Sequence, residues 1–173
     1  GWSTNQIYDR IANIKCNNLA VAYAQHRCSA QSYARAKSQG GLAMLTASQF
    51  IEHVPHSRDL GMEVVSVKGK RVCMRLTPKP WMLADDGGEE ICSSIMYSLA
   101  DSTCGLAVFA EVQRLSPVAT LDLRLDYLQP ANGKRPLLAV ASCRHLTDDI
   151  AFIECEIHSE GEGEPVATGS ATF

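Results

Sequence analysis

The chain has 173 residues, a formal net charge of −3 and a sequence pI of about 5.9. This length suits one domain with a sizeable core. The lack of a basic surplus argues against nucleic acid as a partner, and no apolar run reaches the roughly 18 residues of a membrane span. Because nothing at the start resembles a signal peptide, we expect a soluble cytoplasmic protein that binds neither nucleic acid nor membrane.

Seven cysteines are scattered along the chain without a Cys-x-x-Cys pair. An odd number without paired spacing favours reduced thiols that pack as small apolar side chains. We therefore expect no disulfide, no bound metal and no structural zinc site.

The first 43 residues differ in composition from the rest of the chain. They carry a basic surplus, whereas the remainder is acidic. Asparagine, glutamine and serine interrupt their helical spacing of apolar residues. Gly40-Gly41 marks the end of this part. We predict an accessory helical extension over residues 1–43 and a main domain over residues 44–173.

The next segment predicts a short helix and then a β-hairpin. Thr46 is expected to cap the helix and Pro55 to end it. Residues 62–68 and 71–77 alternate between apolar and polar side chains around a tight turn, as two paired strands do. Residues 78–88 then predict a loop rich in turn-forming residues.

The longest stretch that is apolar enough for a buried helix runs from Glu89 to Phe109. Its apolar residues recur at a spacing of three and four. The helix starts either with the two acids at 89 and 90 or later, with Ser93 or Ser94 as its cap. One carboxylate, Asp101, lies well inside the helix, on a narrow face of polar and small residues.

An aspartate inside an apolar helix costs free energy unless it has a partner. In one interpretation, Asp101 is structural and faces solvent or accepts hydrogen bonds from Tyr97 or a neighbouring strand. In the other, it is a carboxylate in a partly dry site that acts as general base or nucleophile. These residues alone leave both interpretations open.

Beyond the helix, the sequence predicts four strands. The first starts near Ser116 and continues through alternating residues; residues 137–146, 150–159 and 165–173 are the others. One antiparallel sheet with the long helix on its concave face is the economical arrangement, an α+β fold. In the first strand, the face expected to be buried carries Ala119, Leu121, Leu123, Leu125 and Tyr127.

Two motifs resemble those of a known family. They are Leu99-Ala100-Asp101, with Gly105 and Ala107 behind it, and the segment VATLDLRLDYLQPA over residues 118–131. From about residue 47 to residue 173, the chain is similar to hot-dog fold acyl-CoA thioesterases of the phenylacetate-degradation (PaaI-like) type.

This resemblance implies a hot-dog fold, in which an antiparallel sheet wraps around one long central helix. It also implies homodimers formed by pairing sheets edge to edge, often homotetramers, with acyl-CoA hydrolysis at the dimer interface and no cofactor. By the resemblance, Asp101 is the general base or nucleophile and Thr120 orients water. Asp86 stands in the substrate-binding loop, where an asparagine is common in the family.

The chain departs from the family where the helix starts, because Cys92-Ser93-Ser94 replaces the usual His-Gly-Gly. In the family, the backbone N–H at the position of Ser93 polarises the thioester oxygen, helped by the helix dipole. Ser93 keeps that N–H, but two serine side chains occupy space that glycine leaves to the substrate. We expect Cys92 and Ser94 to line the substrate, with Cys92 as a packed thiol rather than a nucleophile.

Three functions are compatible with these residues. A thioester hydrolase is favoured. The second candidate is a module that binds acyl-CoA or an aromatic ligand without turnover, which is expected if the altered residues at the start of the helix have abolished catalysis. A hot-dog dehydratase ranks last, because it needs a histidine beside the aspartate and none lies in or just before the long helix. Basic residues that could meet the phosphates of coenzyme A are Lys134, Arg135, Arg144 and His145.

Overall fold

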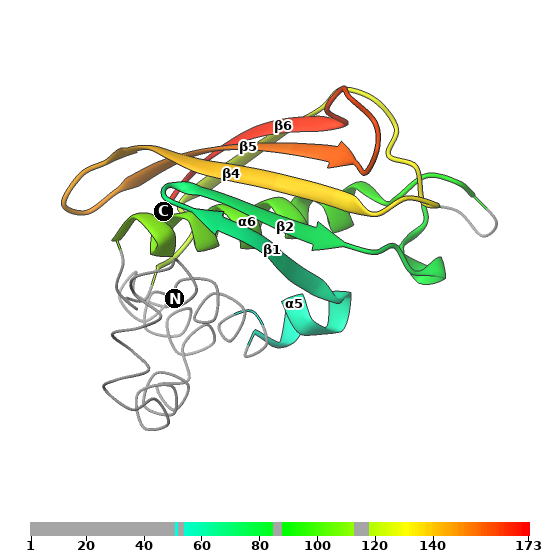
Figure 1. Ribbon diagram of the computed structural model, residues 1–173, viewed down its shortest axis with the longest axis horizontal. Helices are drawn as coiled ribbons and strands as arrows, with labels where there is room; N and C mark the ends of the chain where they lie inside the picture. Colours follow the sequence, from blue (N-terminus) through cyan, green and yellow to red (C-terminus); the bar gives the residue numbers. More distant parts are fainter. Residues whose placement is uncertain (1–50, 52–53, 85–87, 113–117) are drawn as a thin grey trace, which may run out of the picture.

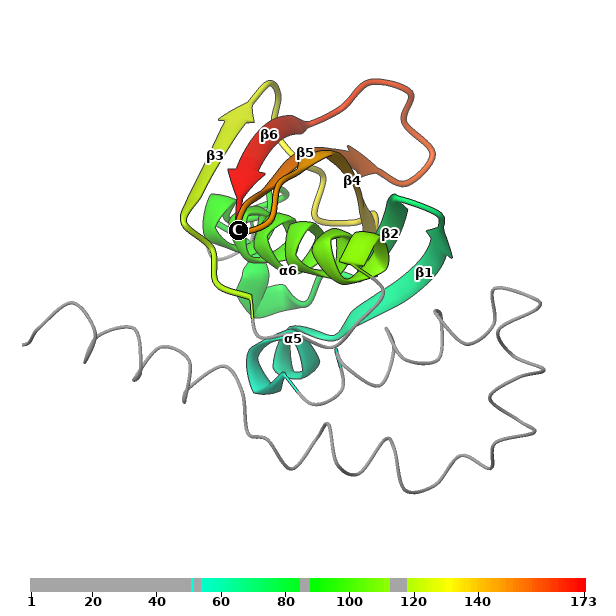
Figure 2. The same ribbon diagram turned by 90° about the vertical axis from the view of Figure 1, so that its left-hand side faces the viewer.

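The computed structural model describes residues 51, 54–84, 88–112 and 118–173. In this part of the chain, six antiparallel strands form one sheet that curves around a long helix (Figure 1 and Figure 2). The strand order is β1-β2-β4-β5-β6-β3, so β1 and β3 are the edges of the sheet. The elements are α5 (Pro55–Leu60), β1 (Met62–Lys68), β2 (Arg71–Leu76), the 3₁₀ turn η1 (Pro80–Met82), α6 (Ser93–Val112), β3 (Asp122–Tyr127), β4 (Leu137–Leu146), β5 (Ala151–Ser159) and β6 (Ala167–Thr172).

The predicted α+β arrangement, an antiparallel sheet wrapped around one long helix, is confirmed. The strands after the helix lie within a few residues of their predicted positions. The predicted extension over residues 1–43 and the cap at Thr46 lie outside the described residues.

The sheet closes over α6 because one side of this helix is almost entirely apolar. α6 packs mainly on β2, β4 and β5, which gives the domain a single core. The apolar residues that predicted a buried helix are indeed buried. The buried side chains of α6 are Ile95, Met96, Leu99, Ala100, Thr103, Cys104, Leu106, Ala107 and Val108.

By length and composition, α6 also suits a membrane span, contrary to the expectation from the sequence. Half of the window that meets these criteria is buried inside the fold. The core helix of a globular domain has the same length and composition, so this property is weak evidence for a membrane.

α6 begins at Ser93, between the two starts that the sequence allowed, and Ser93 and Ser94 are its first residues rather than its cap. The reason is that the residues before it are extended and held from two sides. The N–H of Ile91 donates to the carbonyl oxygen of Ala131 at 2.9 Å. The N–H of Cys92 donates to the carbonyl oxygen of Met82 at 2.8 Å. These backbone bonds hold Ile91 and Cys92 against neighbouring segments, and Ile91 also forms an antiparallel bridge with Leu83, so the helix does not continue back through them.

The β1–β2 hairpin lies where the sequence predicted it, and Gly69 takes a positive φ of 57° at its turn. The helix expected before Pro55 has ended by Val54, which is extended (ψ 106°), whereas Ile51 is helical; Pro55 then begins α5, a helix that the sequence did not predict. Proline suits the first helical position, since its φ is fixed and an N–H there has no acceptor within the helix. Gly61, with φ 76°, ends α5 in the left-handed conformation.

β3 is shorter and less buried than the sequence predicts. Thr120 precedes the strand instead of lying within it. On the face expected to be buried, Leu123 is buried and Leu125 half-buried, whereas Leu121 and Tyr127 are exposed. The reason is that β3 is an edge strand that touches α6 at few points, so the helix does not cover its two ends.

Gly169 in β6 allows β3 to lie close against its neighbouring strand. Gly169 pairs with Leu125, and a Cβ at this position would lie 2.6 Å from the carbonyl oxygen of Arg124. A backbone oxygen at that distance cannot accommodate a methyl group unless the strands move apart.

We predict that Gly169→Ala lowers the free energy of unfolding by about 1–3 kcal/mol, because the added methyl group overpacks the β3–β6 pair. Urea denaturation measures this change. Gly163→Ala is the matched control, since a Cβ at Gly163 meets nothing within 4 Å. Equal stability of the two variants would show that the β3–β6 contact is not as tight as described.

Candidate active site

The site residues that the sequence predicted on α6 lie on the side of the helix that the sheet leaves uncovered. Ser93, Tyr97 and Asp101 recur at every fourth residue and therefore share one face. Ser93 and Tyr97 are exposed, and Asp101 is half-buried. Figure 2 shows α6 along its length, with β3 at one side of it and α5 below it.

The structure brings Asp101 and Thr120 into direct contact. The Thr120 hydroxyl donates a hydrogen bond to Asp101 Oδ1 at 2.6 Å, and both residues are half-buried. In the described part of the chain, the other carboxylate oxygen of Asp101 has no hydrogen-bond partner. Thr120 therefore sets the orientation of the carboxylate, and Asp101 Oδ2 can accept a proton or approach a carbonyl carbon.

Two tyrosines add further links between α6 and the β3 segment. The Tyr97 hydroxyl donates to the carbonyl oxygen of Leu123 at 2.8 Å, and the Tyr127 hydroxyl donates to the carbonyl oxygen of Ser93 at 3.2 Å. Together with the bond from Thr120 to Asp101, they give one link for each turn of the helix. We call this row the α6–β3 seam, made of Ser93, Tyr97 and Asp101 on α6 and Thr120, Leu123 and Tyr127 opposite.

The sequence did not reveal what the two tyrosines bind. Tyr97 was a candidate donor to Asp101, but its hydroxyl goes to the β3 backbone instead. The available signal was that Tyr97 lies four residues before Asp101, which places the two side chains on one face. No local pattern indicated that Tyr127 reaches Ser93, because that contact depends on how the strand lies beside the helix.

Helix α5 contacts the same uncovered face of α6 from its other side. His56 Nε2 lies 3.0 Å from Ser98 Oγ, and Ser57 Oγ lies 3.1 Å from Ser102 Oγ. Ser57 is buried, so the second contact lies inside the fold. The sequence predicted no element for these α5 residues, so it did not reveal their role. α5 and β3 thus fix the helix that carries Asp101 from two directions.

Cys92 directly precedes α6 and acts as its cap. Its Sγ lies 3.2 Å from Ser94 Oγ. The hydroxyl and then the backbone N–H of Ser94 hold the pKa of Cys92 below its ordinary value, because both donate to the thiolate. The Cys92 side chain is half-exposed and packs against the core, whereas Ser93 and Ser94 are exposed. The N–H of Ser93 stands at the first helical position, where the helix supplies no acceptor.

The remaining predicted residues are less informative. Asp86 lies outside the described residues. Three of the basic residues considered for coenzyme A form ion pairs, which satisfy much of their charge locally. These pairs are Lys134 with Glu89, Arg135 with Glu162 at 3.6 Å and Arg144 with Glu154 at 3.0 Å.

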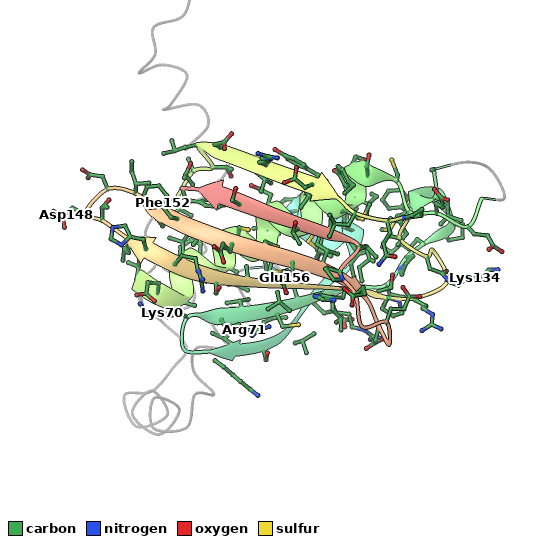
Figure 3. The ribbon with its side chains drawn as sticks, turned by 90° about the horizontal axis from the view of Figure 1, so that it is seen from above. Lys70, Arg71, Lys134, Asp148, Phe152 and Glu156 are labelled. Atoms are coloured by element: carbon green, nitrogen blue, oxygen red, sulfur yellow. The ribbon has the colours of Figure 1, made fainter. Side chains whose placement is uncertain are left out.

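A separate depression of about 230 Å³ lies on the outer face of the sheet. Figure 3 looks onto this face, with Phe152 near one end of the sheet and Lys134 near the other. Residues of β3, β4, β5 and β6 line the depression, among them Asp122, Arg144 and Phe152. Asp101 is absent from its lining, so the depression is distinct from the α6–β3 seam.

The fold agrees with what comparisons with known proteins show. A family model described as the thioesterase superfamily matches residues 94–166, which include Asp101 and Thr120. The Escherichia coli PaaI protein from the phenylacetic acid degradation operon superposes with a TM-score of 0.68 at 22% identity, covering 77% of this chain and 92% of that one. The chain therefore has a hot-dog fold and is similar to the thioesterase superfamily.

Two further known proteins match this chain over most of their own length. The medium/long-chain acyl-CoA thioesterase YigI of Escherichia coli (strain K12) is 28% identical over an alignment of 152 residues that covers 76% of this chain and 97% of that protein. A Pseudomonas aeruginosa protein of known structure is 24% identical with a TM-score of 0.69, covering 76% of this chain and 97% of its own. The predicted resemblance to PaaI-like hot-dog thioesterases is thereby confirmed.

We predict that Cys92 reacts with iodoacetamide before the other four described cysteines. The thiolate is the reactive form, and a pKa below the ordinary value means that more Cys92 is thiolate at any pH between the two pKa values. The rate of alkylation should therefore rise with pH around a lower midpoint in the folded protein than in urea. Peptide mass spectrometry after brief labelling measures this rate at each site.

Cys73 is the internal control for this experiment. Cys73 is also half-exposed, but burial raises its pKa above the ordinary value. Alkylation of Cys73 at the same rate as Cys92 near neutral pH would contradict the proposed role of Ser94.

Proposed function

We propose that the chain hydrolyses the thioester of an acyl-CoA to a free acid and coenzyme A. The observation that carries this proposal is the hydrogen bond from Thr120 to Asp101, which presents an oriented carboxylate on the uncovered face of α6. The activity printed for YigI supports the same reaction. Because a carboxylate and a backbone donor suffice for it, the proposed reaction needs no cofactor.

The proposed reaction uses Asp101 as its general base. Asp101 Oδ2 accepts a proton from a water molecule while the water oxygen attacks the thioester carbonyl carbon. The carbonyl oxygen becomes an oxyanion, and when it collapses the C–S bond breaks and the thiolate of coenzyme A leaves. The proton taken from water then protonates the thiolate. Direct attack by Asp101, through an anhydride that water hydrolyses, gives the same products.

The oxyanion needs a donor, and the N–H of Ser93 suits this task. It stands at the start of a 20-residue helix, where the helix dipole favours negative charge. Backbone hydrogen bonds hold Cys92 and the residue before it on both sides, so the N–H of Ser93 is fixed in position before substrate binds. The exposed side chains of Ser93 and Ser94 flank this N–H and leave less space through which the thioester oxygen can reach it.

One chain cannot bring this donor and this base to one carbonyl group. Ser93 and Asp101 lie eight residues apart on one straight helix, which corresponds to about 12 Å along the axis. Reacting groups in a productive complex lie about 3 Å apart. The proposed site therefore combines Asp101 of one chain with Ser93 of a second copy.

The β3 edge of the sheet supports a second copy as the partner. β3 pairs with β6 on one side only, so its other side offers unpaired backbone groups, and apolar side chains surround it. We propose that two copies pair along this edge, which places the α6–β3 seams of both chains at one interface. The exposed apolar side chains on or beside β3 are Leu121, Tyr127 and Leu128.

We predict that Asp101→Asn lowers kcat for acyl-CoA hydrolysis by about 10²- to 10⁴-fold, the typical contribution of a general base. Thr120→Val should cost roughly 10- to 100-fold, because it removes one hydrogen bond to a charged group but leaves the carboxylate. Release of free thiol from acyl-CoAs of short, medium, long and aryl type measures both effects.

Asp148→Asn is the matched control, because Asp148 is exposed in the turn between β4 and β5, remote from the start of α6 (Figure 3). Full activity of Asp101→Asn would refute the proposed base. If the wild-type chain binds acyl-CoA without releasing thiol, it is instead a binding module, and the exposed serines at Cys92-Ser93-Ser94 are its distinguishing feature.

A further inference from the structure

Tyr97 lies midway between the two groups to which the proposed function assigns chemistry. It is four residues from Ser93 and four from Asp101, so one helical turn of about 6 Å separates it from each. Its side chain is 43% exposed, and its hydroxyl is held by the carbonyl oxygen of Leu123 at 2.8 Å. The ring therefore extends from the helix to the edge strand within the α6–β3 seam.

The ring of Tyr97 belongs to an apolar surface that is exposed in the single chain and that lies at the proposed interface between two copies. Leu121, Tyr127 and Leu128, on or beside β3, are also exposed. α6 packs closely on β2, β4 and β5 but touches β3 at few points, so this surface is the least covered side of the helix. An acyl chain bound beside Asp101 gains free energy from apolar surface of this kind.

We propose that Tyr97 determines which acyl-chain lengths the enzyme accepts; this inference rests on the proposed acyl-CoA hydrolysis. With the thioester carbonyl at Asp101, an acyl chain that follows α6 toward Ser93 meets the tyrosine ring after one turn. The ring ends the available path, so chains that fit before it are preferred over longer ones.

The hydrogen bond to Leu123 makes the ring a fixed obstacle rather than a flexible one. A tyrosine with a free hydroxyl could rotate away from an incoming chain, whereas Tyr97 would have to give up a bond of normal length to do so. Because the backbone carbonyl satisfies the hydroxyl, the ring can lie against an acyl chain without leaving a polar group unpaired.

The test compares kcat/KM over acyl-CoAs of increasing chain length for the wild-type chain and three variants. Tyr97→Ala removes the ring, so the optimum should move to longer chains, with the ratio of long-chain to short-chain kcat/KM rising roughly tenfold or more. Tyr97→Trp enlarges the ring and should move the optimum to shorter chains. Tyr97→Phe keeps the ring and should keep the optimum, with a broader profile.

Phe152→Ala is the control, since Phe152 is an aromatic residue of similar exposure (41%) on the outer face of the sheet. It should leave the chain-length profile unchanged. Circular dichroism and gel filtration establish which variants fold and associate as the wild type does. If Tyr97→Ala fails to fold, Tyr97→Trp still tests the proposal, because it predicts a shift in the opposite direction.

The possible failures are distinguishable. If the wild-type chain hydrolyses no acyl-CoA, the proposed function is wrong and the inference falls with it. If the wild type is active and Tyr97→Ala and Tyr97→Trp both keep its profile, hydrolysis stands and Tyr97 does not select chain length. An equal loss of kcat/KM for every substrate would mean that Tyr97 only holds α6 against β3.

Discussion

The hydrogen bond between Thr120 and Asp101 is the interaction on which the candidate site depends. A half-buried carboxylate in an apolar helix adds little to the stability of the fold. The free-energy cost of desolvating it offsets the free energy gained from its hydrogen bond. An apolar side chain at the same position would suit the helix better. Asp101 is held at 2.6 Å by a hydroxyl from outside the helix, and this supports the catalytic role that we propose for it.

The two sides of α6 have different tasks. One side supplies the apolar residues around which the sheet closes, and the other presents Ser93, Tyr97 and Asp101. Hydrogen bonds from α5 and from the β3 segment hold this second side without covering it. Because eight residues of helix separate donor from base, this arrangement demands a second copy if both act on one thioester.

Much of the fold could be predicted because local sequence and tertiary structure agree. The hairpin around Gly69 and the strands after the helix show clear alternation, and α6 shows a clear period of three to four. The errors arose where contacts between residues distant in sequence determine the secondary structure or the burial of a residue. No helix was predicted after Pro55, although Pro55 begins α5, and Leu121 and Tyr127 are exposed because an edge strand extends where no helix covers it.

For the site, the sequence singled out Asp101, Thr120 and the residues at the start of α6. The pairing of Asp101 with Thr120 was implied only by family resemblance, since 19 positions separate them and no local period connects them. The bonds of Tyr97 and Tyr127 were not predicted, because their acceptors are backbone carbonyls, which carry no sequence signal. The assignment of the thioesterase chemistry to Asp101 stays a prediction.

The central claim is that base and donor come from different copies, and complementation between two inactive variants tests it directly. Asp101→Asn removes the base, whereas Ser93→Pro removes the N–H at a position where proline is compatible with a helix. Co-expressed at equal levels, the two chains should form mixed dimers with one intact site each and recover about a quarter of the wild-type activity by random pairing. Mixed dimers that form but hydrolyse no more acyl-CoA than the separate variants would contradict the claim.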